Sequence, residues 1–188
     1  MKVLLIIVAI ITGVIFMFGL WVMGTYNGFV TRSEGVDTAW AQIEAQYQRR
    51  FDLVPNLVAA TKGIFAQEQK VFGDIADART HYGGTVPASN ERVQALSQYE
   101  SALARLLVIV ESYPQLKSNE TVRGLMDELA GTENRVAVER NRYNEKVREY
   151  NVTLKRFPKN MLAGLFGYEP RAFFDSVEDA SKPPKVEL

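Results

Sequence analysis

Few side chains in this sequence could bind a metal ion. His81 is the only histidine, and there is no cysteine. A zinc site needs three or four ligands, usually His or Cys, so the chain cannot supply one. Because His81 stands beside Gly83-Gly84 in a predicted loop over residues 81–89, we expect it to be solvated rather than part of a buried Ser-His-Asp arrangement.

Charged residues raise two other kinds of site. A two-metal carboxylate site in a helical bundle needs Glu-x-x-His pairs, and none occurs. We therefore expect an ordinary charged helix face at Asp127, Glu128, Glu133, Glu139 and Glu145. The second group is Arg49, Arg50 and Asp52, which could bind phosphate or carboxylate. The simpler interpretation is that Asp52 caps a helix beginning at Leu53 and pairs with the arginines.

Two Tyr-Asn pairs, Tyr143-Asn144 and Tyr150-Asn151, lie one heptad apart and so share a helix face. Tyrosine at such positions usually belongs to the core, with its hydroxyl at the edge. We expect the asparagines to hydrogen-bond across helices and fix their register; a ligand groove is the alternative. No phosphate-binding glycine loop or nucleophile elbow occurs. We therefore predict no catalytic, cofactor-binding or metal-binding residues, and no enzyme.

The charge balance restricts the partners of the chain. Its 188 residues include 22 Lys and Arg and 22 Asp and Glu, and Lys2 is the only charged residue before Arg32. Beyond Lys2 the count is 22 − 1 = 21 basic against 22 acidic residues, without the basic stripe that nucleic acid requires. We expect no nucleic-acid partner. Without cysteine, any anchor must be the peptide itself rather than a lipidated Cys.

The first residues (1–24) predict a transmembrane helix. The segment from Val3 to Met23 carries no charge and would span roughly 31 Å as a helix, close to the hydrocarbon thickness of a bilayer. Trp21 and Tyr26 stand where interfacial aromatic residues belong. The run is too long for a signal peptide, and no small-residue cleavage site follows it. We expect a single-pass protein of the cell inner membrane.

Two properties of this anchor stay open at the level of sequence. Basic residues on its two sides are nearly tied, so the side of the membrane that holds the rest of the chain is not fixed. Ala9 and Gly13 form a small-xxx-small spacing that can bring two helices together. Such pairs are also common in ordinary apolar helices.

Beyond the anchor, apolar residues recur at steps of three and four almost to residue 157, and no stretch alternates with period two. This predicts an all-α fold: an antiparallel up-and-down four-helix bundle with long helices over residues 25–157. The expected boundaries are a turn at Arg50–Pro55, the loop 81–89 with Ser89 or Asn90 as the next cap, a break at Tyr113-Pro114, and a last helix over about 118–156 that opens at Ser118. A continuous, Pro-kinked helix from the membrane to residue 79 is the alternative to the turn.

The C-terminal segment, residues 158–188, mixes aromatic and basic side chains. Four helix reversals would return it to the bilayer. It would then lie on the lipid headgroups or close the open end of the bundle as a lid, and both could hold together. The residues from Ser181 to Lys185 predict an extended tail.

Motifs that carry a family resemblance run in order through nearly the whole chain. They are Trp40-Ala41-Gln42-Ile43-Glu44, the runs 49–58 and 128–135, Arg142-Tyr143-Asn144, the run 147–151, Phe157-Pro158 and Phe173-Phe174. On these residues the chain resembles the LemA family of bacterial membrane-anchored proteins. The resemblance implies an up-and-down four-helix bundle behind a transmembrane helix. Glu139 departs from the family, where a small residue is expected, which speaks against close packing there.

Genes of this family often lie beside genes for a membrane-bound, stress-linked zinc metalloprotease. The resemblance therefore implies a partner in membrane quality control. We expect a membrane-anchored, non-enzymatic helical scaffold or adaptor that associates with copies of itself, as a homo-oligomer, and serves membrane or envelope quality control. Its expected partners are the lipid bilayer, further copies of the chain, and a membrane protease or other membrane protein. The alternative is a lipid-organising membrane-contact protein that uses the anchor and the aromatic C-terminal segment, residues 157–174, to grip the same or apposed bilayers; Phe166, Phe173 and Phe174 are the residues whose replacement would test it.

Overall fold

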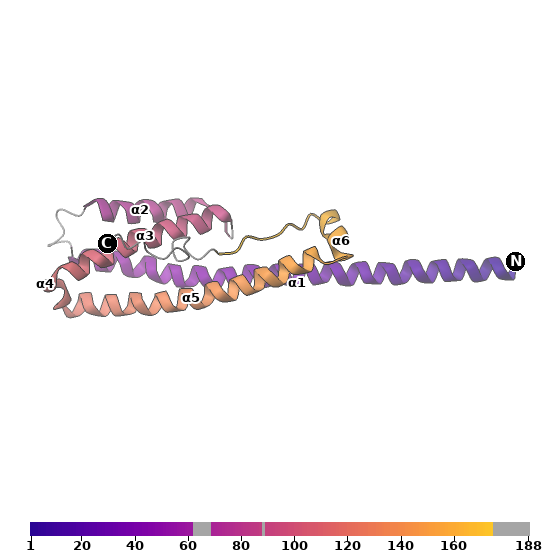
Figure 1. Ribbon diagram of the computed structural model, residues 1–188, viewed down its shortest axis with the longest axis horizontal. Helices are drawn as coiled ribbons and strands as arrows, with labels where there is room; N and C mark the ends of the chain where they lie inside the picture. Colours follow the sequence, from indigo (N-terminus) through magenta and orange to yellow (C-terminus); the bar gives the residue numbers. More distant parts are fainter. Residues whose placement is uncertain (62–68, 88, 175–188) are drawn as a thin grey trace, which may run out of the picture. The chain divides into compact units, whose positions relative to one another are not determined.

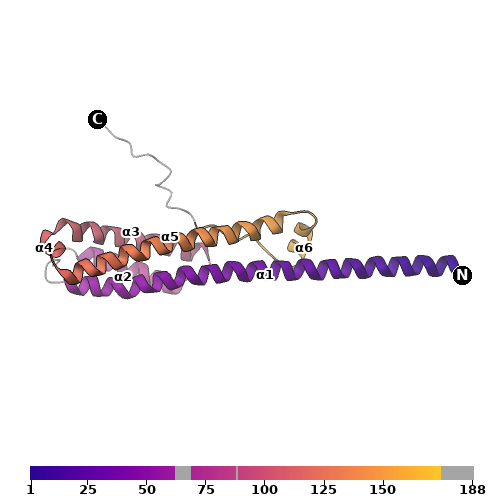
Figure 2. The same ribbon diagram turned by 90° about the horizontal axis from the view of Figure 1, so that it is seen from below.

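The computed structural model describes residues 1–61, 69–87 and 89–174 (Figures 1 and 2). Its elements are α1 (Lys2–Thr61), α2 (Gln69–Gly84), α3 (Asn90–Ser112), α4 (Pro114–Lys117), α5 (Glu120–Lys155) and α6 (Lys159–Leu165). No strand occurs in these three ranges, so the all-α prediction is confirmed there. The expected tail from Ser181 to Lys185 lies outside the described residues.

The chain divides into two compact units. The anchor unit is Met1–Thr38 with Glu145–Arg171, and the core unit is Ala39–Asn144 with Ala172–Leu188. Both α1 and α5 contribute residues to each unit.

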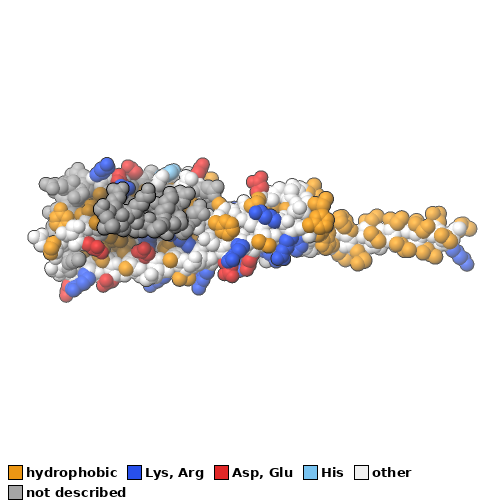
Figure 3. Space-filling model, in the orientation of Figure 1, with side chains coloured by type: hydrophobic (Ala, Val, Ile, Leu, Met, Phe, Trp, Pro, Cys, Tyr) orange, Lys and Arg blue, Asp and Glu red, His pale blue; other side chains and the backbone are white. Residues whose placement is uncertain are grey.

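The N-terminal part of α1 is apolar and exposed (Figure 3). Among the described residues, α1 is the one helix with a stretch long and apolar enough to cross a membrane; the stretch has a mean hydropathy of 3.0 and is 0% buried. An apolar surface of this size is costly in water and stable in hydrocarbon. Length and composition therefore make it a candidate membrane span and suggest a single N-terminal anchor.

The turn predicted at Arg50–Pro55 is wrong, because α1 continues through it to Thr61. Asp52 does not begin a helix; its carboxylate accepts a hydrogen bond from Gln48 Nε2 (3.1 Å) within α1. Pro55 itself is exposed, whereas Phe51 and Leu57 near it in the same helix are buried. Burial of these side chains outweighs the cost of an interior proline, about 3 kcal/mol. The alternative of a continuous helix to residue 79 holds as far as Thr61, since residues 62–68 lie outside the described ranges.

Side-chain contacts set the directions of the helices in the core unit. On α1, Trp40 packs against Tyr143 of α5 (ring centroids 5.4 Å apart), and Arg50, ten residues on, reaches Thr132. As the residue number rises along α1, the residues that it contacts on α5 have falling numbers. These two stretches therefore run antiparallel. The same reasoning applies to α2 and α3, which lie side by side (Figure 1): Asp74 pairs with Arg105 and His81 meets Gln98.

The core of this unit is aliphatic with several buried rings. Phe51 lies at its centre, with its ring centroid 4.7 Å from that of Tyr99 and 5.1 Å from that of Tyr82. Other buried side chains come from all the longer helices: Ile43, Tyr47, Leu57, Ile75, Leu96, Leu106, Leu129, Val136 and Tyr143.

Contacts also explain the helix ends. The loop predicted from His81 begins later, because α2 runs on to Gly84. Tyr82 holds that last turn, since its ring packs on Phe51 and its hydroxyl donates to Glu44 Oε1 (3.1 Å). The predicted cap at Ser89 is confirmed: its side chain accepts from the N–H of Arg92 (3.1 Å).

The later boundaries lie close to their predicted places. α3 ends at Ser112, and Pro114 opens α4, as the Tyr113-Pro114 pair predicts. α5 begins at Glu120 rather than at Ser118. The capping side chain is that of Asn119, whose Oδ1 accepts from the N–H groups of Thr121 (2.9 Å) and Val122 (3.2 Å).

In the anchor unit, α6 packs against α1 directly after the candidate span. The ring of Phe166 meets that of Tyr26 edge-on (5.1 Å between centroids), and Tyr168 lies 5.3 Å from Phe29. Leu162 and Ala163 are the buried residues of α6. The N–H of Tyr168 donates to the carbonyl of Ala163 (2.9 Å) and closes the end of this short helix.

Candidate functional site

A cluster of charged side chains is enclosed by α1, α3 and α5 in the core unit. Glu100 Oε1 accepts hydrogen bonds from the hydroxyl of Tyr47 (2.7 Å) and from Arg50 Nη1 (3.3 Å). It also forms an ion pair with Arg140 Nη2 (2.5 Å). Arg50 is only 4% exposed, and its Nε donates to Thr132 Oγ1 (3.0 Å). One carboxylate thus gathers two guanidinium groups and a phenol.

The surroundings of Tyr47 and of Arg140 each favour one protonation state. Burial, reinforced by the charge of Glu100, raises the pKa of Tyr47 above its usual range, so the phenol stays neutral and donates. Burial disfavours the charged form of Arg140, but the hydrogen bonds and charge interactions with Glu100 and Tyr47 together outweigh it and raise the pKa of the guanidinium. Groups held in one protonation state suit structural ion pairing rather than proton transfer. The cluster ties three helices together.

The arginine-rich motif from the sequence is thereby split. Arg50 points into the cluster, whereas Arg49 is exposed and pairs with Glu128. Sequence reasoning missed Glu100 and Arg140. The available signal was that Glu100 follows Tyr99 within an otherwise apolar stripe of the third helix, where an acid needs a partner.

The asparagines of the Tyr-Asn pairs hydrogen-bond to the C-terminal segment of the same chain rather than across helices as expected, while the ring of Tyr143 packs on Trp40 of α1. In the core unit, Asn144 Nδ2 donates to the carbonyl of Phe174 (2.9 Å) and Asn144 Oδ1 accepts from its N–H (2.7 Å). The hydroxyl of Tyr143 donates to the carbonyl of Ala172 (3.1 Å). Phe174 itself is 2% exposed, with its ring 6.1 Å from that of Trp40 and 4.3 Å from the guanidinium of Arg140.

The second pair repeats the pattern inside the anchor unit. Asn151 Nδ2 donates to the carbonyl of Arg171 (2.8 Å), and its Oδ1 accepts from the N–H of Arg171 (2.9 Å). The hydroxyl of Tyr150 donates to the carbonyl of Glu169 (3.1 Å). Burial raises the pKa of Tyr150, which keeps its hydroxyl a donor. The side chain of Arg171 also pairs with Asp37 (3.3 Å).

Each asparagine therefore acts as a neighbouring β-strand would, because it meets both the N–H and the C=O of one residue. The spacing has a physical reason. Seven residues of helix rise about 10.5 Å, and three residues of extended chain advance about 10 Å. A Tyr-Asn pair repeated at a heptad can thus meet every third residue of an extended segment. The polar groups that the ligand-groove alternative would use hydrogen-bond instead to the chain's own backbone.

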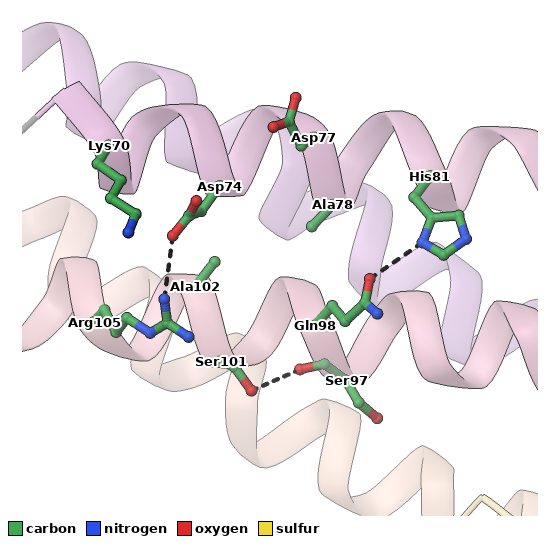
Figure 4. Close-up of a pocket in the computed structure, with 10 residues that line it drawn as sticks. All are labelled: Lys70, Asp74, Asp77, Ala78, His81, Ser97, Gln98, Ser101, Ala102 and Arg105. Atoms are coloured by element: carbon green, nitrogen blue, oxygen red, sulfur yellow. Dashed lines mark hydrogen bonds and ion pairs between the residues drawn. The ribbon is translucent and has the colours of Figure 1, made fainter.

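A groove of ≈ 720 Å³ lies between α2 and α3 (Figure 4). Part of its polar lining is internally paired: Arg105 Nη1 lies 3.1 Å from Asp74 Oδ2, and His81 Nδ1 lies 3.1 Å from Gln98 Oε1. Ser101 Oγ donates to the carbonyl of Ser97 (2.9 Å). His81 is exposed, as expected, but on a helix rather than in a loop.

The acidic residues of the fourth predicted helix do not converge. Glu128 pairs with Arg49, and Glu139 with Arg142 (2.7 Å) three residues on. Among the described residues, no group of three or more His, Asp or Glu side chains could hold a metal ion. The Glu139 side chain is 15% exposed and pairs with Arg142, so the chain accommodates a charge where its family resemblance predicted a small residue.

Comparison with known proteins places these features in a family. The model of the LemA family matches residues 39–188, which include the core unit and both Tyr-Asn pairs. Two curated relatives from Paramagnetospirillum magneticum, named magnetosome protein MamQ 1 and MamQ 2, are 29% identical over 183 residues, 84% of this chain and 67% of theirs. Magnetosome protein MamQ of Magnetospirillum gryphiswaldense is 29% identical over 79% of this chain and 64% of its own length.

Proposed function

The chain belongs to the LemA family, and from this premise we propose that it is a membrane-anchored, non-enzymatic helical scaffold or adaptor. The observation that carries the proposal is the continuity of α1. One helix begins with the exposed apolar stretch and ends among the buried residues of the core unit. A partner that binds the core unit is then held at the membrane by the same helix.

We further propose that the core unit is an antiparallel up-and-down four-helix bundle made of the last part of α1 with α2, α3 and α5. The antiparallel pairs α1–α5 and α2–α3 support this arrangement. The chain would be a single-pass protein of the cell inner membrane. The locked ion pairs of Glu100 support a structural rather than a catalytic use of its charged residues.

Self-association is the part of this function that one experiment can test directly. Ala9 and Gly13 face outward on the candidate span, and a Cβ built on Gly13 meets no other atom within 4 Å. Two copies could therefore approach closely there. Sedimentation equilibrium of the full chain in mild detergent should show an oligomer that Gly13→Leu shifts toward monomer. Gly19→Leu is the matched control, because Gly19 lies about 240° around the helix from Gly13 and is equally open. A monomeric wild-type chain at high concentration would refute self-association.

The side of the membrane decides which partners the scaffold can reach, including the membrane protease expected from the family. The cysteine-free chain allows a single reporter, Thr85→Cys, in the loop after α2. If a membrane-impermeant maleimide labels it in cells whose inner membrane is intact, the core unit faces envelope proteins. If labelling needs lysis, the core unit faces the cytoplasm and the cytosolic side of membrane proteases.

A further inference from the structure

An exposed apolar face is formed by α6 and the turn before it. Phe157, in that turn, is 80% exposed, and Met161 and Leu165 on α6 are 68% and 75% exposed. Met161 and Leu165 are four residues apart and so share a face of the helix. The buried residues of α6 are Leu162 and Ala163. Three large apolar side chains aimed away from the protein need an apolar environment.

The anchor unit itself fixes where this face lies. Phe166, just after α6, packs on Tyr26, and Tyr26 is only three residues beyond Met23, the end of the apolar run taken as the span. Three helical residues rise about 4.5 Å, and the headgroup layer on each side of a bilayer is about 5–7 Å thick. With the apolar stretch across the hydrocarbon core, Tyr26 and the ring of Phe166 are at headgroup depth.

Cations flank the apolar face as they do in helices that lie on membranes. Lys155 and Arg156 directly precede Phe157 and are exposed, and Lys159 is half-exposed at the start of α6. Long basic side chains reach phosphate groups while apolar neighbours enter the acyl boundary. The position of this apolar face, its exposure and the flanking cations all favour contact with a phospholipid leaflet.

We propose that α6 is an interfacial helix that inserts Phe157, Met161 and Leu165 into the leaflet next to the end of the anchor, with Lys155, Arg156 and Lys159 on its phospholipid headgroups. The bilayer is the one that the anchor crosses, so the proposal rests on the anchor but not on self-association. The sequence-based alternative places lipid contact on the whole segment 157–174, and the structure narrows the residues available for it. Phe174 is buried in the core unit and Phe166 packs on Tyr26, so those two rings are engaged within the protein.

The test is a depth measurement on the full chain in nanodiscs. The absence of cysteine allows single reporters, Met161→Cys and Leu165→Cys, each carrying the environment-sensitive dye NBD. Val86→Cys is the matched control, because Val86 is 68% exposed and belongs to the core unit. The nanodiscs contain phosphatidylcholine, with or without phosphatidylglycerol, and lipids that carry a nitroxide quencher at the headgroup or along the acyl chain. Ile15→Cys reports on the anchor separately.

We expect nitroxide lipids to quench the dyes at 161 and 165, most strongly when the nitroxide is near the headgroup, and to leave the dye at 86 unquenched. Quenching should deepen with phosphatidylglycerol, and this gain should be lost when Lys155, Arg156 and Lys159 become Gln. If the dye at 15 is quenched but those at 161 and 165 are not, the anchor stands and the proposal for α6 is overturned. Protection of 161 from aqueous iodide without lipid quenching would also overturn it, because a protein surface would then cover the face. No quenching at 15 would refute the anchor itself.

Discussion

Asn144 pairs with both backbone groups of Phe174, at 2.9 Å to its carbonyl and 2.7 Å from its N–H, thirty residues downstream. Asn144 binds the backbone of Phe174 rather than its side chain, and these hydrogen bonds hold the C-terminal segment on α5. The ring of Phe174 then completes the core around Trp40 and Arg140. The segment is thus a structural part of the core unit and not an appendage.

Replacing Asn144 should release this segment. Asn144→Leu removes two neutral hydrogen bonds, so we expect a loss of about 1–2 kcal/mol in its local stability. Hydrogen exchange followed by mass spectrometry should show the peptide containing Ala172–Phe174 exchanging roughly tenfold faster or more. Asn134→Leu, at an exposed position of the same helix, is the control and should leave that peptide unchanged. Equal protection in both variants would show that the carboxamide does not hold the segment.

The cluster around Glu100 should be far more sensitive than the exposed ion pair on the same helices. Glu100→Gln leaves Arg50, which is 4% exposed, without its counter-charge, and we expect a loss of about 3 kcal/mol. Glu128→Gln removes the partner of Arg49, but those side chains are 41% and 57% exposed, so we expect less than about 1 kcal/mol. Urea unfolding of the full chain in detergent, followed by circular dichroism, measures both. Similar losses in the two variants would contradict the structural role of the cluster.

The sequence carries the helical period clearly, which is why the all-α fold and the Ser89 and Pro114 boundaries could be predicted. Contacts between residues far apart in the chain are much harder to predict from the sequence. The Tyr-Asn heptad was visible, but its partner is an extended segment without a period, so a helix was assumed as its neighbour. Pro55 and Asp52 look like a turn locally, and only the burial of Phe51 and Leu57 makes the helix continue. An acid at Glu100 within an apolar stripe indicates that it needs a partner, but the sequence does not show that Arg50 and Arg140 reach it from two other helices.

Tyr99 makes the core unit sensitive to alkali. Burial raises the pKa of its hydroxyl above the ordinary value. Below about pH 10 both the folded and the unfolded chain keep this proton, so its contribution to stability is fully present. As the pH rises further, the unfolded chain ionises first, and the free energy of unfolding falls by up to about 1.4 kcal/mol per pH unit for each such tyrosine.

Tyr99→Phe should therefore reduce this alkaline loss. Its hydroxyl is buried with no hydrogen-bond partner among the described residues, so the variant should keep its stability near pH 7 or gain slightly. Tyr47→Phe is the informative comparison, because it too should reduce the alkaline loss but should weaken the protein at neutral pH, where its hydroxyl bonds to Glu100. Urea unfolding at about pH 8 and about pH 10.5 measures both. An unchanged pH dependence in Tyr99→Phe would refute the prediction.

Because α1 is continuous through Pro55, replacing this proline should stabilise the protein. If Pro55 lay in a turn, the same replacement should destabilise it. Inside a helix, Pro55 offers no N–H to the carbonyl of Phe51, and its exposed ring contributes little burial. Pro55→Ala should restore that hydrogen bond and raise the free energy of unfolding by about 1–3 kcal/mol. Pro87→Ala, in the loop between α2 and α3, should leave stability unchanged or lower it, since there the ring only restricts the unfolded chain. Thermal unfolding of the full chain in detergent compares the two. If Pro55→Ala destabilises the protein as much as a lost turn residue would, α1 does not run unbroken from the anchor into the core unit.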